Sequence, residues 1–199
     1  MAAEEEQAGR RYREGADGRR ARGERRRTEL ISATLRVVER DGVAGLTHRA
    51  VAHEAGVPAS SAVYHFATLD ALLVAALTVA ADAYVHQLRQ VRESGGDAID
   101  GLSALVAVGS GSGRRRILAE YELTLLAVRR PALRPIARRW MDMVAEVAGE
   151  YTADPVAIRA AVAAVDGLCM SALLEDRPVS AADVHAVLRH ILRLDLRTD

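Results

Sequence analysis

The sequence is poor in cysteine, in aromatic residues and in long apolar runs, and it contains no lysine. Its single cysteine, Cys169, excludes an internal disulfide framework and any zinc site built on several thiolates. The longest apolar run, 71–81, is closed by Asp82 and falls well short of the roughly 18 residues that a membrane span requires. The N-terminal residues are acidic and then arginine-rich, unlike the apolar stretch of a secretory signal. We therefore expect a cytoplasmic protein without a membrane partner.

A net charge of zero conceals an uneven distribution of charge along the chain. All 27 basic residues are arginine, and between residues 10 and 27 nine arginines stand against three acids. From residue 67 onward, fifteen arginines are outnumbered by seventeen acids. A basic front end on a mildly acidic body is typical of a protein that contacts nucleic acid at one end. A solvated basic tail without a target is the alternative.

Helical periodicity covers the chain after an initial arm. Residues 1–24 contain four glycines, many charges and few large aliphatic residues, so we expect a flexible arginine-rich arm. Apolar residues then recur at helical spacing, interrupted by glycine, by proline and by Thr47 and Thr68, which we expect to be N-caps. No sustained period-two alternation indicates a strand. We predict an all-α protein with about nine helices, over residues 25–41, 47–55, 59–66, 69–93, 97–108, 114–128, 132–150, 155–175 and 180–196.

The segment 48–65 has the pattern of a helix-turn-helix. Val51 and Val57 supply apolar positions that would pack two short helices against the preceding one, and Ala52 is small where those helices should cross. Gly56 falls where the chain must turn sharply with positive φ, a conformation that glycine adopts without steric cost. A small residue, then glycine four positions later, then an apolar residue is typical of this motif.

This segment resembles the DNA-binding domain of the TetR/AcrR family of repressors. The resemblance rests on four runs in one order, namely GVAGLTHRAVA (42–52), AGVP (55–58), SS (60–61) and YHF (64–66). It covers about residues 25–75, and the remainder fits the family only in the number and order of helices. The resemblance implies an N-terminal three-helix DNA-binding domain over 25–68, followed by a helical ligand-binding and dimerisation domain over 69–199.

The expected DNA contacts lie at the start of the first short helix and along the second. The second helix would enter the major groove, and the N-terminus of the first favours a phosphate. Arg49 is the candidate for a guanine contact, because a guanidinium can engage O6 and N7 together. The resemblance implies that Tyr64 and His65 reach phosphates, whereas Phe66 packs as core. The predicted DNA-binding residues are Thr47, His48, Arg49, Ser60, Ser61, Tyr64 and His65.

Alternative roles exist for some of these residues, and the sequence departs from the family pattern nearby. His48 has a plain exposed position as its alternative, and the two serines have helix capping. Leu69 stands where the family commonly has a phosphate-gripping lysine, Val63 replaces an aromatic residue, and Ala59 offers little base readout. We expect the arginine-rich arm to compensate by supplying charge to the DNA backbone or minor groove.

The later helices are expected to supply a dimer interface and an effector cavity. Segments 155–175 and 180–196 carry apolar faces, and the resemblance implies that they form a four-helix bundle with a second subunit. Two half-sites one DNA turn apart also require two recognition helices. Burial of both faces within one chain is the alternative. Candidates for lining the cavity are Tyr84, Tyr121, Glu122, Trp140, Met143 and Asp166, with ordinary core packing or salt bridges as their alternative.

The resemblance thus implies a ligand-responsive, DNA-binding transcriptional regulator. It would be a repressor that binds a palindromic operator as a homodimer and is released by a small, largely apolar effector. The helix 69–93 would link the cavity to DNA. We expect neither a cofactor nor a metal, and no nucleophile-elbow, phosphate-loop or metal-helix motif supports the rival, an all-helical enzyme. A second rival is an interaction module that kept the fold and lost DNA binding.

Overall fold

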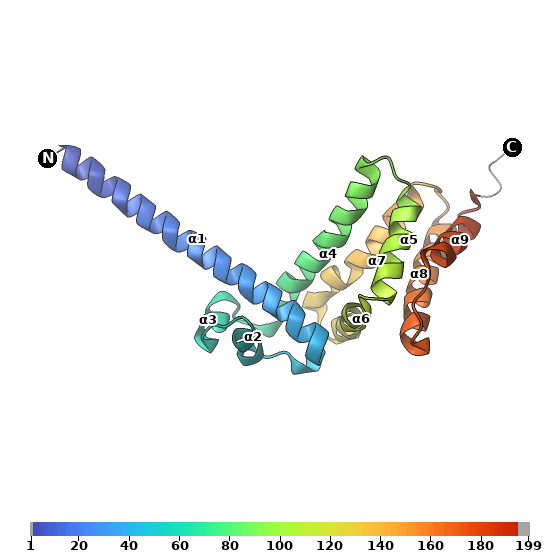
Figure 1. Cartoon of the computed structure of the whole chain (residues 1–199), viewed down its shortest axis with the longest axis horizontal. Helices are drawn as coiled ribbons and strands as arrows, with labels where there is room; N and C mark the ends of the chain where they lie inside the picture. Colours follow the sequence, from blue (N-terminus) through green and yellow to red (C-terminus); the bar gives the residue numbers. More distant parts are fainter. Residues whose placement is uncertain (1, 195–199) are drawn as a thin grey trace.

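A computed structural model describes residues 2–194, and every element within that range is helical (Figure 1). This confirms the predicted all-α class and the number of α-helices for the part of the chain that is described. Two short 3-10 helices, η1 and η2, are added to the predicted elements. The elements are α1 Ala2–Asp41, η1 Val43–Gly45, α2 His48–Glu54, α3 Ala59–His65, α4 Leu69–Glu93, α5 Ala98–Ser110, α6 Arg114–Arg129, η2 Pro131–Leu133, α7 Arg134–Gly149, α8 Pro155–Glu175 and α9 Ala181–Ile191.

Helix α1 begins at Ala2 rather than near residue 25, so the predicted arm is a helical extension of α1. In Figure 1 its N-terminal half extends away from all the other helices. The sequence prediction considered only the lack of large aliphatic residues that could be buried. Alanine, glutamate and arginine are strong helix formers, and their local preference continues the helix through the glycines.

Side-chain caps and a glycine set the boundaries of the short helices. Thr47 accepts a hydrogen bond from the Ala50 amide at 3.0 Å and begins α2, and Thr68 accepts one from the Ala71 amide at 3.1 Å and begins α4. Both caps were predicted. Gly56 turns the chain between α2 and α3 with φ of 64°, in the left-handed region that favours glycine.

The first hydrophobic core joins α1, α2 and α3 to the start of α4. Val51 and Leu72 are fully buried there, and Phe66 is buried as predicted. Two alanines, Ala52 and Ala62, are buried on α2 and α3 and let these helices approach closely. This packing fixes α2 and α3 as one rigid unit against α1.

The second core lies in the body, among α4, α5, α6, α7, α8 and α9. Its fully buried side chains include Ile99, Leu102, Val144, Val165 and Leu188. Helices α5 and α9 pack together, as do α7 and α8. Residues 195–196 of the predicted dimer segment lie outside the described residues.

Helices α4 and α8 are long and apolar enough, by length and composition alone, to cross a membrane. Core helices of soluble proteins pass the same test, and α4 buries Leu72, Leu73 and Leu88 inside the protein. Helix α8 likewise buries Val165 and Cys169, but it leaves Val156 and Leu174 exposed by 61% and 80% of their surface. The apolar character of α8 therefore provides a surface in addition to a core face.

Candidate DNA-binding surface and effector cavity

The predicted DNA contacts are accessible on α2 and α3. Thr47, Arg49 and Ser60 are exposed, and 84% of the Tyr64 surface is open. The remaining members of the predicted set are half-buried, namely His48, Ser61 and His65. The Tyr64 and His65 rings meet edge to face with centroids 5.1 Å apart. No described part of the chain covers the recognition helix, so a duplex can reach it.

His48 also makes a contact within the protein. Its Nε2 lies 2.8 Å from the carbonyl oxygen of Phe66, the residue directly after α3. The ring therefore closes the motif by joining the start of α2 to the end of α3. Above Phe66, the Arg27 guanidinium sits 4.8 Å from the ring centroid, a cation–π contact from α1. The predicted DNA contact of His48 remains a prediction beside this structural role.

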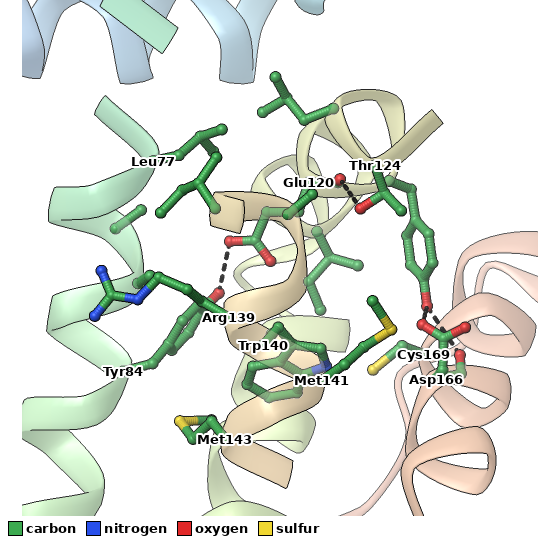
Figure 2. A pocket seen from close by; sticks show the side chains of 18 of the residues that line it. Leu77, Tyr84, Glu120, Thr124, Arg139, Trp140, Met141, Met143, Asp166 and Cys169 are labelled. Atoms are coloured by element: carbon green, nitrogen blue, oxygen red, sulfur yellow. Dashed lines mark hydrogen bonds between the residues drawn. The ribbon is translucent and has the colours of Figure 1, made fainter. Parts of the chain in front are cut away.

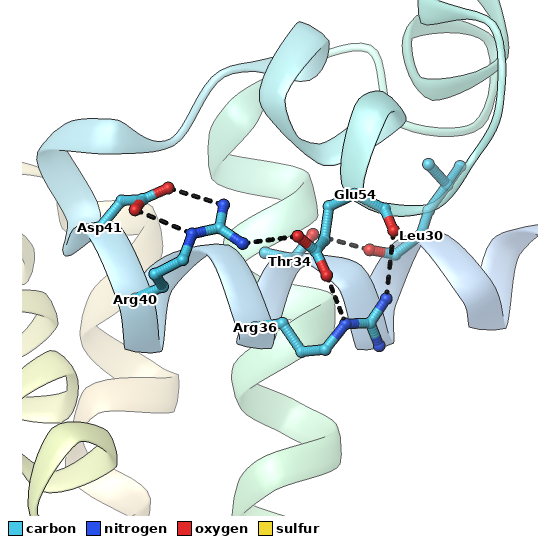
Figure 3. A network of polar contacts seen from close by, with 6 residues as sticks. All are labelled: Leu30, Thr34, Arg36, Arg40, Asp41 and Glu54. Carbon is cyan, nitrogen blue, oxygen red and sulfur yellow. Dashed lines mark hydrogen bonds and ion pairs between the residues drawn. The ribbon is translucent and has the colours of Figure 1, made fainter.

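A cluster of charges, here called the Glu54 clamp, fastens α2 to α1 (Figure 3). The Glu54 carboxylate accepts hydrogen bonds from Arg36 Nε at 2.7 Å and from an Arg40 guanidinium nitrogen at 2.6 Å. Arg40 also pairs with Asp41 at 2.8 Å. Hydrogen bonds from Arg36 and then Arg40 hold the pKa of Glu54 below its usual range. The clamp and the apolar core together set the angle at which the motif leaves α1.

The body encloses a cavity of about 350 Å³ among α4, α5, α6, α7 and α8 (Figure 2). Five of the six predicted lining residues are there, namely Tyr84, Tyr121, Trp140, Met143 and Asp166. Among the other lining residues, the sequence analysis missed the polar ones, Glu120, Thr124 and Arg139, and the buried Cys169. Most of the wall is apolar, so the site suits a guest with a large apolar surface.

Glu120 brings a carboxylate to the cavity wall. Its Oε1 accepts a hydrogen bond from the Tyr84 hydroxyl at 3.0 Å and one from Arg116 Nε at 3.3 Å. Burial raises the pKa of Glu120 above its usual range, and Arg116 opposes part of that rise. The Tyr84 ring is also 5.3 Å from the Trp140 ring, centroid to centroid. Aromatic faces therefore lie next to a carboxylate.

On the opposite wall of the cavity, a contact between a tyrosine and an aspartate joins α6 to α8. The Tyr121 hydroxyl of α6 lies 2.8 Å from Asp166 Oδ1 and 2.9 Å from the Asp166 carbonyl oxygen on α8 (Figure 2). Cys169 lies one turn further along α8 and is buried. Burial raises the pKa of its thiol to about 12, so the sulfur stays protonated near neutral pH. Cys169 thus acts as an apolar lining residue rather than a nucleophile.

The prediction that Glu122 lines the cavity is wrong. Its Oε2 accepts a hydrogen bond from the Val43 amide at 2.7 Å, outside the cavity and at the start of η1. Two residues along a helix correspond to a rotation of about 200°, so Glu120 and Glu122 point to nearly opposite sides of α6. Apolar residues occur on both of those sides, and hydrophobic periodicity alone gives no way to tell the two glutamates apart.

Two family models match the chain. The model described as bacterial regulatory proteins, tetR family, matches residues 30–76. The model described as tetracyclin repressor-like, C-terminal domain, matches residues 93–194. The search of the curated proteins gave no match.

Solved structures of similar proteins align with this chain over nearly the whole length of those proteins. Multidrug binding protein EbrR complexed with ethidium is 41% identical, covers 83% of this chain and 97% of its own, and has a TM-score of 0.69. EbrR complexed with malachite green is 40% identical, with 83% and 96% coverage and a TM-score of 0.69. A TetR-family member from Streptomyces coelicolor A3 is 41% identical, with 83% and 97% coverage and a TM-score of 0.72.

The first matched segment contains the helix-turn-helix and most of the core that supports it, and the second contains most of the cavity wall. Regulators of this family are DNA-binding proteins, and EbrR shows that some of them bind small molecules. The chain belongs to the TetR family of bacterial transcriptional regulators.

Proposed function

We propose that this protein is a repressor that binds a palindromic operator as a homodimer and releases it when an effector fills the cavity. The observation that carries the proposal is the pairing of an accessible helix-turn-helix with an apolar cavity in the same chain. An effector would act by binding more tightly to the conformation in which the two recognition helices are wrongly spaced. Such a regulator acts in the cytoplasm, where the operator is.

The effector we propose is an aromatic molecule of mostly apolar surface that carries a positive charge. Tyr84 and Trp140 offer ring faces, and Glu120 offers a negative charge that the chain only partly compensates through Arg116. Cations are attracted to aromatic faces as well as to carboxylates. The similar protein EbrR has been solved with ethidium, with proflavin and with malachite green, all of which are aromatic dyes.

The dimer we propose forms through α8 and α9. On α8, Val156, Met170 and Leu174 are exposed. A Cβ added at Gly167 would meet nothing within 4 Å, so a partner helix has room to approach α8 closely there. Exposed apolar side chains on both sides of Gly167 suit packing against a second copy of the same helix across a two-fold axis. Sedimentation of the purified protein should give about twice the chain mass of 21.4 kDa, and a monomer at operator-binding concentrations would contradict the proposal.

The DNA-binding proposal is tested by an electrophoretic shift on the fragment upstream of the protein's own gene. We expect a shifted band that survives excess unrelated DNA and disappears when the same fragment is added unlabelled. The matched variant Ser60→Ala/Tyr64→Ala removes two exposed side chains of α3 and should abolish the selective band. The absence of any shifted band would support the rival interaction module instead, and equal shifting of unrelated DNA would contradict a selective operator.

A further inference from the structure

Helix α6 is shared by both halves of the molecule. Ala119 and Ala127 are buried in the core of the DNA-binding domain, Glu120 and Tyr121 line the cavity, and Leu123 belongs to both. Figure 1 shows α6 beside the C-terminal end of α1, with which it is in contact. A change on the cavity side of this helix therefore has a short route to the helix-turn-helix.

Glu122 is the residue of α6 that reaches the DNA-binding domain with a directional contact. The Val43 amide donates to Glu122 Oε2 at 2.7 Å, across 79 positions of sequence. Hydrogen bonds to a carboxylate are about twice as strong as those between neutral groups. The contact is made at the beginning of η1, four residues before the cap of α2 at Thr47.

The backbone around this contact is shaped to admit the carboxylate. Gly42 has φ of 71°, and a Cβ built there would lie 2.9 Å from Glu122 Oε2. A side chain at this position would strain the backbone and would displace the Glu122 carboxylate. Gly42 therefore serves two purposes, since it ends α1 and also leaves space for a side chain from the body.

We propose that Glu122 is a positioning residue that couples the cavity to the helix-turn-helix through the Val43 amide. The inference rests on the proposed function, and it places the coupling in α6 in addition to the long helix α4. A guest that pushes on Glu120 or Tyr121 turns or shifts α6. Because Glu122 lies within one turn of both residues, its carboxylate moves with them and carries η1 and the start of α2.

The test compares the wild type with Glu122→Ala, Glu122→Gln and the control Glu146→Ala, which alters an exposed glutamate on α7. Malachite green is the probe, and its effect on the DNA fragment alone is measured in parallel. Dye affinity without DNA should stay within about twofold for every variant, because Glu122 is outside the cavity. In the wild type and Glu146→Ala we expect the dye to weaken operator binding at least about tenfold, within the usual range of coupling.

In Glu122→Ala the dye should weaken operator binding by less than about threefold. Glu122→Gln, which keeps an oxygen acceptor, should show an intermediate effect of the dye. The variant Val43→Pro removes the amide hydrogen from the other side, at the first helical position where proline is tolerated. Val43→Pro should show the same loss of the dye's effect on operator binding. If circular dichroism shows that Glu122→Ala does not fold, the result for Val43→Pro tests the proposal in its place. A full wild-type factor in the folded variants would overturn the proposal.

A second measurement separates this proposal from the proposed function. If the dye leaves wild-type operator binding unchanged, the proposed switch fails, and the coupling is judged without a ligand. In a Cys169→Ala background, which leaves no third thiol, spin labels at His53→Cys and Ala104→Cys, both exposed positions, report the distance between α2 and α5. Adding Glu122→Ala should broaden that distance distribution, and an unchanged distribution would reject the coupling role.

Discussion

The DNA-binding domain and the body of this protein are packed in contrasting ways. In the domain, α2 and α3 cross on buried alanines, and the Glu54 clamp fastens them to α1. The body surrounds a cavity of about 350 Å³ instead. A motif that must fit a duplex gains from having one arrangement, whereas a site for apolar guests gains from unfilled space. The contrast teaches that rigidity and adaptability are divided between two regions that meet at α6.

The largest difference between the two regions should appear when an alanine in each is replaced by leucine, which adds the same side-chain volume to both. Ala62→Leu overpacks the α2–α3 crossing, where Ala62 is fully buried, and should lower the free energy of unfolding by about 1–3 kcal/mol. Operator binding should be lost with it. Ala81→Leu adds the same atoms to the cavity wall, where there is space, and should leave stability within about 1 kcal/mol while weakening dye binding.

Urea unfolding and dye titration of both variants check this comparison. Equal destabilisation by the two leucines would show that the cavity is as tightly packed as the motif. In that case the division between a rigid and an adaptable region would be wrong.

The next largest effect should be a loss of dye affinity when the charge of the cavity carboxylate, Glu120, is removed. Glu120→Gln keeps the shape of the side chain and removes its charge, so malachite green affinity should fall about tenfold, equivalent to about 1.4 kcal/mol. Fluorescence titration measures the affinity, and Glu146→Gln on the exposed side of α7 is the matched control. Operator binding without dye should be the same in both variants. Undiminished dye affinity in Glu120→Gln would exclude the charge as a determinant of the effector.

A smaller effect is expected from the arginine-rich half of α1. Removing residues 2–24 deletes a basic segment that lies away from the folded core, so operator affinity should fall by less than about tenfold. Each lost phosphate contact should also reduce the slope of log affinity against log salt concentration by about 0.9. Binding isotherms at several salt concentrations check both values. Unchanged affinity and slope would show that the segment makes no contact with DNA.

The smallest effect concerns the pH dependence of the Glu54 clamp. Its arginine partners hold the pKa of Glu54 below the ordinary value of 4.5, so the clamp favours the folded state above that value. This contribution is lost as the pH falls through the lowered pKa. Glu54→Gln should therefore be less stable than the wild type at pH 7 and approach it in acid. Thermal unfolding from pH 7 to pH 3 measures this, and a constant difference between the two proteins would argue against it.

Local rules predicted the DNA-binding domain well. The N-caps Thr47 and Thr68, the positive φ of Gly56 and the burial of Phe66 all follow from signals within a few residues, and the structure confirms them. Even the bounds of α4, 69–93, were predicted correctly. The start of α1 was not, because absence of burial was taken as absence of helix, although the segment contains strong helix formers.

The cavity was harder to predict because it depends on which side of each helix faces which neighbour. Tyr84, Tyr121 and Trp140 were correctly placed there, since large aromatic residues in apolar helices point inward. Glu122 was predicted to line the cavity in the place that Glu120 occupies, because α6 packs on both sides and its sequence has no single apolar stripe. The contact between Glu122 and Val43 joins distant parts of the chain, and no local pattern announces it.

The central claim is that filling the cavity changes the affinity of the helix-turn-helix for DNA. The most direct measurement is the operator affinity of the purified protein, taken with and without saturating malachite green. The account predicts that the bound dye weakens operator binding at least about tenfold, and that operator DNA weakens dye binding by the same factor. Tight dye binding that leaves operator affinity unchanged would contradict it.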